Sequence, residues 1–171
     1  LQSLPSSIGK LTNLQHLNIP NNHNLQSLPS SIGKLTNLQH LNISDNTLQP
    51  LSHSFSTLTN LRHLNISNNV NLQSLPSSIG NLTNLQHLTI SYNHNLQSLP
   101  SSIGNLTNLQ HLDVSDNELE TIPCEMAPLI ERLGFLHFEF EGNPLSLLPV
   151  DTHDDLLCLI EHLSQQTGPM M

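Results

Sequence analysis

Six histidines recur at one position of a repeated sequence motif, and they are the most conspicuous residues that could do chemistry. They are His16, His40, His63, His87, His111 and His137. Imidazoles bind metals and change charge between about pH 5 and 8, so the column suggests either a metal ladder or a pH-sensitive surface. A metal needs ligands that converge on one point, and side chains at equivalent strand positions do not converge. Copying of one ancestral unit explains the column equally well, and we assign no metal to it.

The other reactive side chains form no catalytic constellation. The many serines lie in the turn segments of the repeats. Neither Cys124 nor Cys158 has a helix N-terminus and a histidine arranged to activate its thiol. The Asp154–Asp155 pair is typical of a solvated helix start, and there is no phosphate loop or zinc spacing. We therefore expect no enzyme activity, no catalytic residue and no cofactor.

These positions belong to a repeat that organises the whole chain. Residues 96–117 read LQSLPSSIGNLTNLQHLDVSDN, and successive units are 24, 23, 24, 24 and 23 residues long. Self-similarity at a fixed period of this length predicts a solenoid, in which stacked units share one continuous core. The units start at Leu1, Leu25, Leu48, Leu72, Leu96 and Leu119, and half of a seventh starts at Leu145.

The second half of each unit fits the pattern LxxLxLxxNxL, as in Leu109, Leu112, Val114, Asn117 and Leu119. This pattern resembles the leucine-rich repeat family over nearly the whole chain. The first half, LPxxIGxLxxL, is similar to the intracellular Ras-group and plant types, and similar repeats occur in bacterial effectors. The resemblance implies an α/β right-handed solenoid with a parallel β-sheet on the concave face and short helical or 3₁₀ turns on the convex face. It also implies a C-terminal capping helix and a role in binding other proteins.

Alternation along each strand decides which side chains face the core. In the second unit it points Leu41 and Ile43 inward and His40, Asn42 and Ser44 outward. A separate asparagine column follows each strand, where a buried side-chain amide can satisfy backbone donors and acceptors of the turn. We expect this structural role for Asn22, Asn46, Asn69, Asn93, Asn117 and Asn143.

We divide the chain into about six repeats over residues 1–144 and a partial repeat, cap helix and tail over residues 145–171. The segment CEMAPLIERLGF, residues 124–135, has room for a fuller helical turn. Thr152-x-x-Asp155 resembles a capping box, and apolar residues then follow at helical spacing. They are Leu156, Leu159, Ile160 and Leu163.

Charge and cysteine content limit the class of partner. The net charge is −9 with only 4 Lys and Arg, which argues against nucleic acid or a membrane surface as the partner. Two cysteines without clustered spacing, and no signal-peptide or membrane-spanning pattern, favour a reducing compartment. We expect a cytoplasmic location, or the host cytosol if the protein is a bacterial effector.

Because the units are near copies, concave positions where they differ are more informative than positions where they agree. Tyr and Arg are favoured at binding hot spots, so Tyr92 and Arg62 are the strongest single candidates. The predicted partner-binding residues combine these departures with the histidine column. They are His40, Arg62, His63, His87, Thr89, Tyr92, His111, Asp113, His137, Glu139 and Glu141.

The function we predict from the sequence is non-catalytic binding of a protein partner through the concave face. The alternative is the substrate-recognition domain of a larger protein, such as a bacterial effector acting in a host cell, including effectors of the ligase-linked type. We expect a monomer, with self-association possible through an uncapped N-terminal end at Leu1, Leu4 and Ile8.

Overall fold

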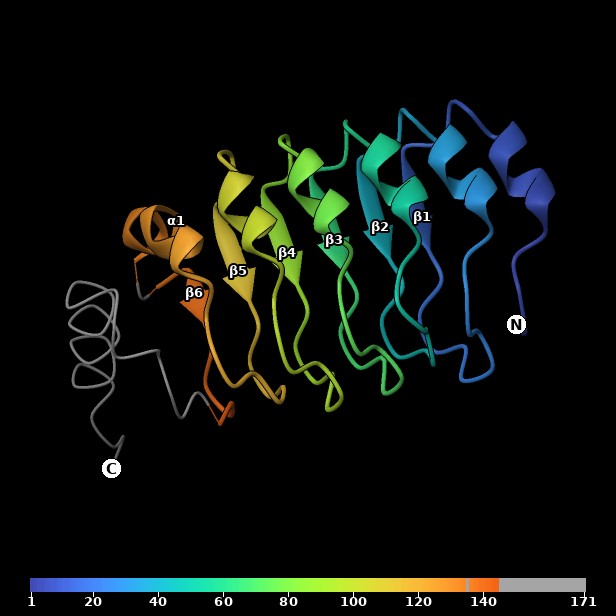
Figure 1. Cartoon of the computed structure of the whole chain (residues 1–171). Helices are drawn as coiled ribbons and strands as arrows, with labels where there is room; N and C mark the ends of the chain where they lie inside the picture. The colour runs from blue at the N-terminus through green and yellow to red at the C-terminus, as the bar shows by residue number, and fades with distance from the viewer. Residues whose placement is uncertain (135, 145–171) are drawn as a thin grey trace.

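The computed structural model describes residues 1–134 and 136–144, and their centre is one parallel sheet. Six short strands lie side by side in sequence order, as Figure 1 shows. Equivalent residues pair across them, so His16 lies beside His40 and His40 beside His63. The predicted parallel sheet is confirmed. The strands are β1 (His16–Asn18), β2 (His40–Asn42), β3 (His63–Asn65), β4 (His87–Thr89), β5 (His111–Asp113) and β6 (Phe138–Glu139).

One short turn of 3₁₀ helix precedes each of the first five strands, and Figure 1 shows these turns as a second row beside the sheet. In four of them a proline stands directly before the first helical residue, with φ between −65° and −69°, where its missing N–H costs no hydrogen bond. These short turns confirm the prediction. They are η1 (Ser6–Lys10), η2 (Ser30–Lys34), η3 (His53–Thr57), η4 (Ser77–Asn81) and η5 (Ser101–Asn105).

The sixth unit carries a longer helical segment, as the extra length of residues 124–135 predicts. A 3₁₀ turn, η6 (Cys124–Met126), leads directly into the helix α1 (Ala127–Leu133). The helix buries Leu129, Ile130 and Leu133 against the end of the core.

Glycine in the repeated SSIG phrase allows neighbouring turns to approach closely. A Cβ atom added at Gly80 would lie 2.4 Å from the carbonyl oxygen of Ser102, in the turn of the next unit. At Gly104 the same atom would lie 2.3 Å from the carbonyl oxygen of Glu125. At Gly80 and Gly104 the neighbouring turns therefore lie too close for a Cβ atom, whereas the divergent third unit has Ser56 at the equivalent position.

Inward leucine and isoleucine side chains from successive units form one core. Leu41 and Ile43 are buried, and Phe55 fills the apolar position of the divergent third unit. At the first unit the core is open, because Leu1 is 61% exposed and Leu11 is 51% exposed.

The expected outward position of Ser44 is wrong, because this side chain is only 5% exposed. The strand ends at Asn42, so the alternation of faces also ends there. The chain then turns at Asp45, whose φ is +56°, so the strand alternation does not keep Ser44 exposed.

A ladder of buried asparagines ties consecutive units together. Asn69 is fully buried, and its side-chain nitrogen donates to the carbonyl oxygens of Ile66 and Ser67 in its own unit and of Ile43 in the preceding one. Its side-chain oxygen accepts from the N–H of Leu48, at 3.1 Å. The structural role predicted for this column is confirmed.

A second set of asparagines links units at the surface. Asn60 donates to the carbonyl oxygen of Thr36 at 2.8 Å, and Asn37, Asn84 and Asn108 make the equivalent bond. Because these groups are exposed, water can replace either partner.

Some sequence expectations concern parts of the chain outside the described residues. Phe135 of the apolar column and the cap helix expected around residues 156–163 both lie there, so the proposed boundary at residue 144 remains a prediction. Within residues 1–134 and 136–144, no helix is long and apolar enough to cross a membrane.

The two asparagine sets make a matched comparison of buried and exposed bonds. We expect Asn69→Ala to lower the free energy of unfolding by about 3 kcal/mol, because it leaves several buried backbone groups without partners. Asn60→Ala should cost less than about 1 kcal/mol, because water replaces its exposed bond. Urea unfolding followed by circular dichroism measures both; equal losses would contradict this account of the ladder.

Candidate functional site

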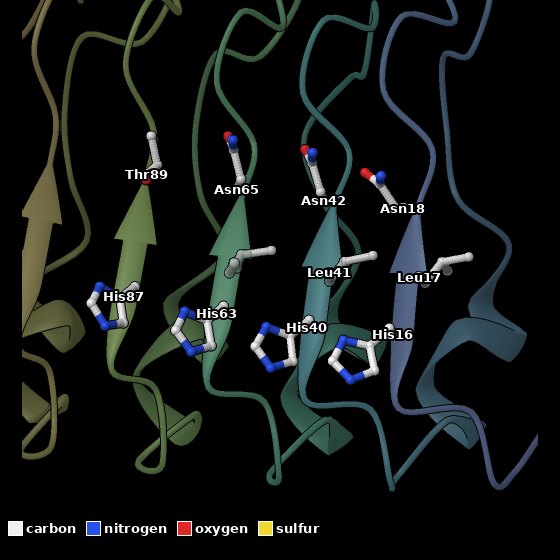
Figure 2. A pocket seen from close by; sticks show the side chains of 11 residues that line it. His16, Leu17, Asn18, His40, Leu41, Asn42, His63, Asn65, His87 and Thr89 are labelled. Carbon is white, nitrogen blue, oxygen red and sulfur yellow. The ribbon is translucent and has the colours of Figure 1, made fainter.

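The concave face carries the histidine column as a stack of rings. The rings of His16, His40, His63 and His87 follow one another with centroids 4.3, 4.3 and 4.5 Å apart and planes within 14° of parallel. Figure 2 shows one ring projecting from the start of each strand. The parallel register of the strands produces this spacing, because it places equivalent side chains side by side.

Partial burial and neighbouring positive charge lower the basicity of the central imidazoles. The pKa of His40 and His63 lies below the usual value of 6.5, first because partial burial disfavours the charged form and then because neighbouring histidines and Arg62 repel a second positive charge. Burial also lowers the pKa of His87, with smaller contributions from His111 and His137. Neutral rings are therefore favoured in the middle of the stack.

The stack does not present a metal site. The ring planes of His40 and His63 are within 8° of parallel, so the lone pairs in those planes run side by side and do not meet at one ion. Within the part of the chain that the structure describes, no group of three or more His, Cys, Asp or Glu side chains is arranged to hold a metal.

An open groove of ≈ 550 Å³ runs across the first four strands of this face. Histidines line it at the start of each strand, leucines lie between, and Asn18, Asn42, Asn65 and Thr89 line the other side (Figure 2). The groove therefore offers ring nitrogens along one side and amides with a hydroxyl along the other.

Part of the amide side also holds the chain where it leaves the strand. The side-chain oxygen of Asn65 accepts from the backbone N–H of Ser67 at 2.9 Å and from its hydroxyl at 2.7 Å. Asp113 makes the same two bonds to Ser115, at 3.0 and 2.6 Å. Asp113 thus has a local structural role in addition to the contact role predicted for it. Thr89 departs from this column and stands in register with Asp113.

Tyr92 lies on the loop after β4, 52% exposed, in a left-handed backbone conformation with φ of +59°. The placement agrees with the rim position predicted for it. Other units put residues that tolerate this conformation at the same place, namely Asn21, Asp45, Asn68, Asp116 and Gly142. The charge of Asp116 and a hydrogen bond to it raise the pKa of the tyrosine hydroxyl. The backbone of Tyr92 is therefore strained, and its hydroxyl is oriented toward Asp116.

The remaining predicted contact residues fall into two places. Arg62 is exposed before β3, near the stacked rings. Toward the C-terminal end, the Nε2 atom of His111 lies 3.7 Å from a carboxylate oxygen of Glu139. The carboxylate of Glu141 accepts from the backbone N–H of Phe140 at 3.2 Å, and His137 is exposed before β6. The structure therefore places the histidines of β1 to β5 in one row across the sheet. Arg62, before β3, lies apart from Glu139 and Glu141 at the C-terminal end.

Sequence reasoning missed Arg132, which lies on α1. Its guanidinium donates to the carbonyl oxygens of Leu106 and Leu109, and it lines a second hollow together with His111 and His137. A signal was present, because the chain has only 4 Lys and Arg residues and Arg132 is one of them. Its partners lie in the preceding unit, and that proximity is not visible in the sequence.

The lowered histidine pKa values predict a loss of stability in acid. Unfolded histidines take up protons near pH 6.5, whereas His40, His63 and His87 do so only at lower pH when folded. Lowering the pH below 6.5 therefore favours the unfolded state, and the free energy of unfolding should fall between pH 7.5 and 5.5. Replacing His63 by Gln should flatten this dependence, and replacing His94, an exposed loop residue outside the stack, should not. Urea titrations at each pH measure the effect.

The conformation of Tyr92 predicts a stabilising substitution. We expect Tyr92→Asn to raise the melting temperature by about 2–4 °C, because asparagine tolerates a positive φ better than tyrosine does. Tyr92→Phe, which keeps the strain and removes the hydroxyl bonded to Asp116, should not raise it. A lower melting temperature for Tyr92→Asn in differential scanning calorimetry would contradict the strain argument.

Comparison with known proteins gives consistent matches to one family. The family described as "Leucine-rich repeat region" matches residues 2–96, and "Leucine Rich repeats (2 copies)" matches residues 83–125. No curated protein matches the chain.

Several solved structures share the fold. A leucine-rich repeat protein of Leptospira interrogans is 34% identical over 84% of this chain and 41% of its own, with a TM-score of 0.63. The leucine-rich repeat domain of the type III effector XopL is 29% identical over 83% of this chain and 49% of its own, with a TM-score of 0.70. The ectodomain of the Arabidopsis receptor kinase HAESA, solved with a peptide hormone ligand, is 32% identical over 82% of this chain, with a TM-score of 0.70. This chain covers 24% of that structure.

The chain thus spans less than half the length of these three structures. One family match extends over residues 2–96 of a chain of 171, and the parallel sheet with its row of short turns has the architecture of the matched structures. The chain therefore belongs to the leucine-rich repeat family.

Proposed function

We propose that this chain binds a protein partner through its concave face and performs no catalysis itself. The observation that carries the proposal is the groove across β1–β4, which is lined by polar side chains at both ends of the strands. A rigid sheet holds these groups in place before binding, so little conformational entropy is lost when a partner docks.

The groove has the chemistry of a recognition surface. Its imidazole and amide groups can donate or accept hydrogen bonds, whereas the leucines between them belong to the core, with Leu41 and Leu64 each only 2% exposed. Tyr92, at the loop end of β4, offers a large exposed aromatic side chain, a residue type enriched at binding hot spots. The net charge of −9 favours a protein over nucleic acid or a membrane as the partner.

Related structures support binding to proteins as the class of function. The HAESA ectodomain was solved with a peptide hormone ligand, and another neighbour, 31% identical, comes from a complex of the Arabidopsis proteins BIR3 and SERK2. These partners belong to those proteins. They support the class of interaction here and identify no partner.

A second candidate function is substrate recognition within a larger protein that acts inside a host cell. The similarity to the leucine-rich repeat domain of the type III effector XopL, and the short span of this chain relative to its structural neighbours, favour it. In that case the protein would work in the host cytosol and any ligase activity would reside elsewhere. For both functions we propose a cytosolic monomer, with self-association through the exposed Leu1 and Leu11 end as the competing arrangement.

The proposed function predicts that charge on the groove abolishes binding. We would use wild-type protein as bait in affinity capture from plant and animal cell lysates, beside a variant with His40→Glu, His63→Glu and Thr89→Glu. Three carboxylates on adjacent strands of the groove should weaken binding of each specific partner at least about tenfold, so that about 90% of it is lost from the captured material. A tenfold change in affinity corresponds to about 1.4 kcal/mol of binding free energy.

A control variant places the same three charges outside the groove of the same units. Thr36→Glu, Thr59→Glu and Thr83→Glu lie on exposed loops between the turns and strands and should retain each partner. Circular dichroism and melting curves must show that both variants are folded. Equal capture by the two variants would exclude the groove, and a binding partner lost only with the loop variant would place the interface there.

A further inference from the structure

The histidine stack is interrupted between the fourth and fifth strands. The rings of His63 and His87 are 4.5 Å apart and within 8° of parallel, but those of His87 and His111 are 6.0 Å apart and tilted by 39°. The ring of His111 lies near the carboxylate of Glu139, at 3.7 Å. The opening leaves one face of the His87 ring, and the ring of His111, without a closely stacked neighbour at this break.

A second hollow, of ≈ 600 Å³, lies at this break. Its polar lining comes from β4, from β5 and the residue directly before it, from α1 and from the loop before β6. Leu109 and Leu133 form its apolar part. The polar residues are His87, Gln110, His111, Arg132 and His137.

Arg132 is held in position by the protein itself. Its guanidinium donates to the carbonyl oxygens of Leu106 and Leu109, which fixes the side chain beside the hollow. Two carbonyl bonds use only part of its five N–H donors and leave its positive charge without a carboxylate partner among these bonds.

We propose that this hollow binds a carboxylate group from an acidic segment of the protein partner. The proposal rests on the proposed function, because the ligand belongs to the protein that the concave face recognises. The carboxylate would receive hydrogen bonds from Arg132 and from the imidazoles of His87, His111 and His137, with Gln110 as a further donor. Charge-assisted bonds of this kind are stronger than bonds between neutral groups.

The charges around the hollow favour a single carboxylate and predict its pH dependence. Arg132 contributes one positive charge to the hollow, and the carboxylates of Glu139, 3.7 Å from His111, and of Asp113, in register with Glu139, add negative charge beside it. Each imidazole that takes up a proton adds one positive charge, and a bound carboxylate favours that protonation. Binding should therefore strengthen as the pH falls from 7.5 to 5.5, while glutamate side chains stay mostly ionised.

The test uses the 171-residue chain and a defined probe, the capped peptide acetyl-hexaglutamate amide. Binding is measured by calorimetry at pH 7.5 and 5.5, and ¹H–¹³C spectra of the imidazoles locate the site. We expect affinity to increase at least about tenfold at the lower pH, with shifts at His87, His111 and His137. The control peptide acetyl-hexaglutamine amide should not bind at either pH.

Substitutions separate this hollow from the rest of the histidine row. His111→Gln and His137→Gln should each weaken hexaglutamate binding at pH 5.5 about fivefold or more, because each removes one imidazole donor. His16→Gln, at the far end of the row, is the matched control and should change the affinity less than twofold. Arg132→Gln should weaken binding at both pH values, and a melting curve shows whether loss of its carbonyl bonds unfolds α1.

Three results would overturn the proposal. They are no hexaglutamate binding at pH 5.5, equal weakening by His16→Gln and His137→Gln, and inorganic phosphate binding as tightly as the peptide with the same spectral shifts. The second result would mean that all histidines of the row attract the peptide non-specifically through their charge. The third would mean that the hollow binds small inorganic anions and not a protein carboxylate. None of these variants alters β2 or β3, so failure here leaves the capture experiment on the concave groove unaffected.

Discussion

The buried asparagine ladder is the interaction on which the rest of this structure depends. A solenoid must turn its backbone sharply after each strand, and that turn lies inside the stack, where water cannot satisfy its polar groups. Asn46 and Asn69 each donate to carbonyls of two consecutive units, and their side-chain oxygens accept N–H groups from the preceding turn. Because an unsatisfied buried group costs about 1–3 kcal/mol, the ladder fixes both the turn and the register between units.

The fixed register has a direct consequence for the surface. Once Asn46 and Asn69 are aligned, the strand residues of the two units are aligned with their counterparts, including the histidines at the start of each strand. The stacked rings are therefore a product of core geometry. Partial burial, and then the neighbouring histidines and Arg62, lower the pKa of the central members, so a structural constraint inside the core becomes an electrostatic property outside it.

Departures from the repeat change this surface toward its C-terminal end. The stack opens between His87 and His111, Tyr92 occupies a backbone conformation that its counterparts give to small polar residues or glycine, and Asp113 and Glu139 stand side by side on paired strands. Helix α1 brings Arg132 against the same region. One end of the concave face is therefore regular and rich in neutral hydrogen-bonding groups, and the other is irregular and charged, which suits a partner with distinct features along its length.

The sequence by itself determined the period, the apolar columns, the parallel sheet, the short turns and the role of the buried asparagines. These features follow from contacts that every unit repeats, so one unit, such as residues 96–117, contains the information for all of them. The tertiary structure alone decided the burial of Ser44, the break in the stack and the position of Arg132 beside His111. Each of these depends on where a strand ends or on how a divergent unit sits against its neighbour. Such relations join residues far apart in the chain, and no local pattern encodes them.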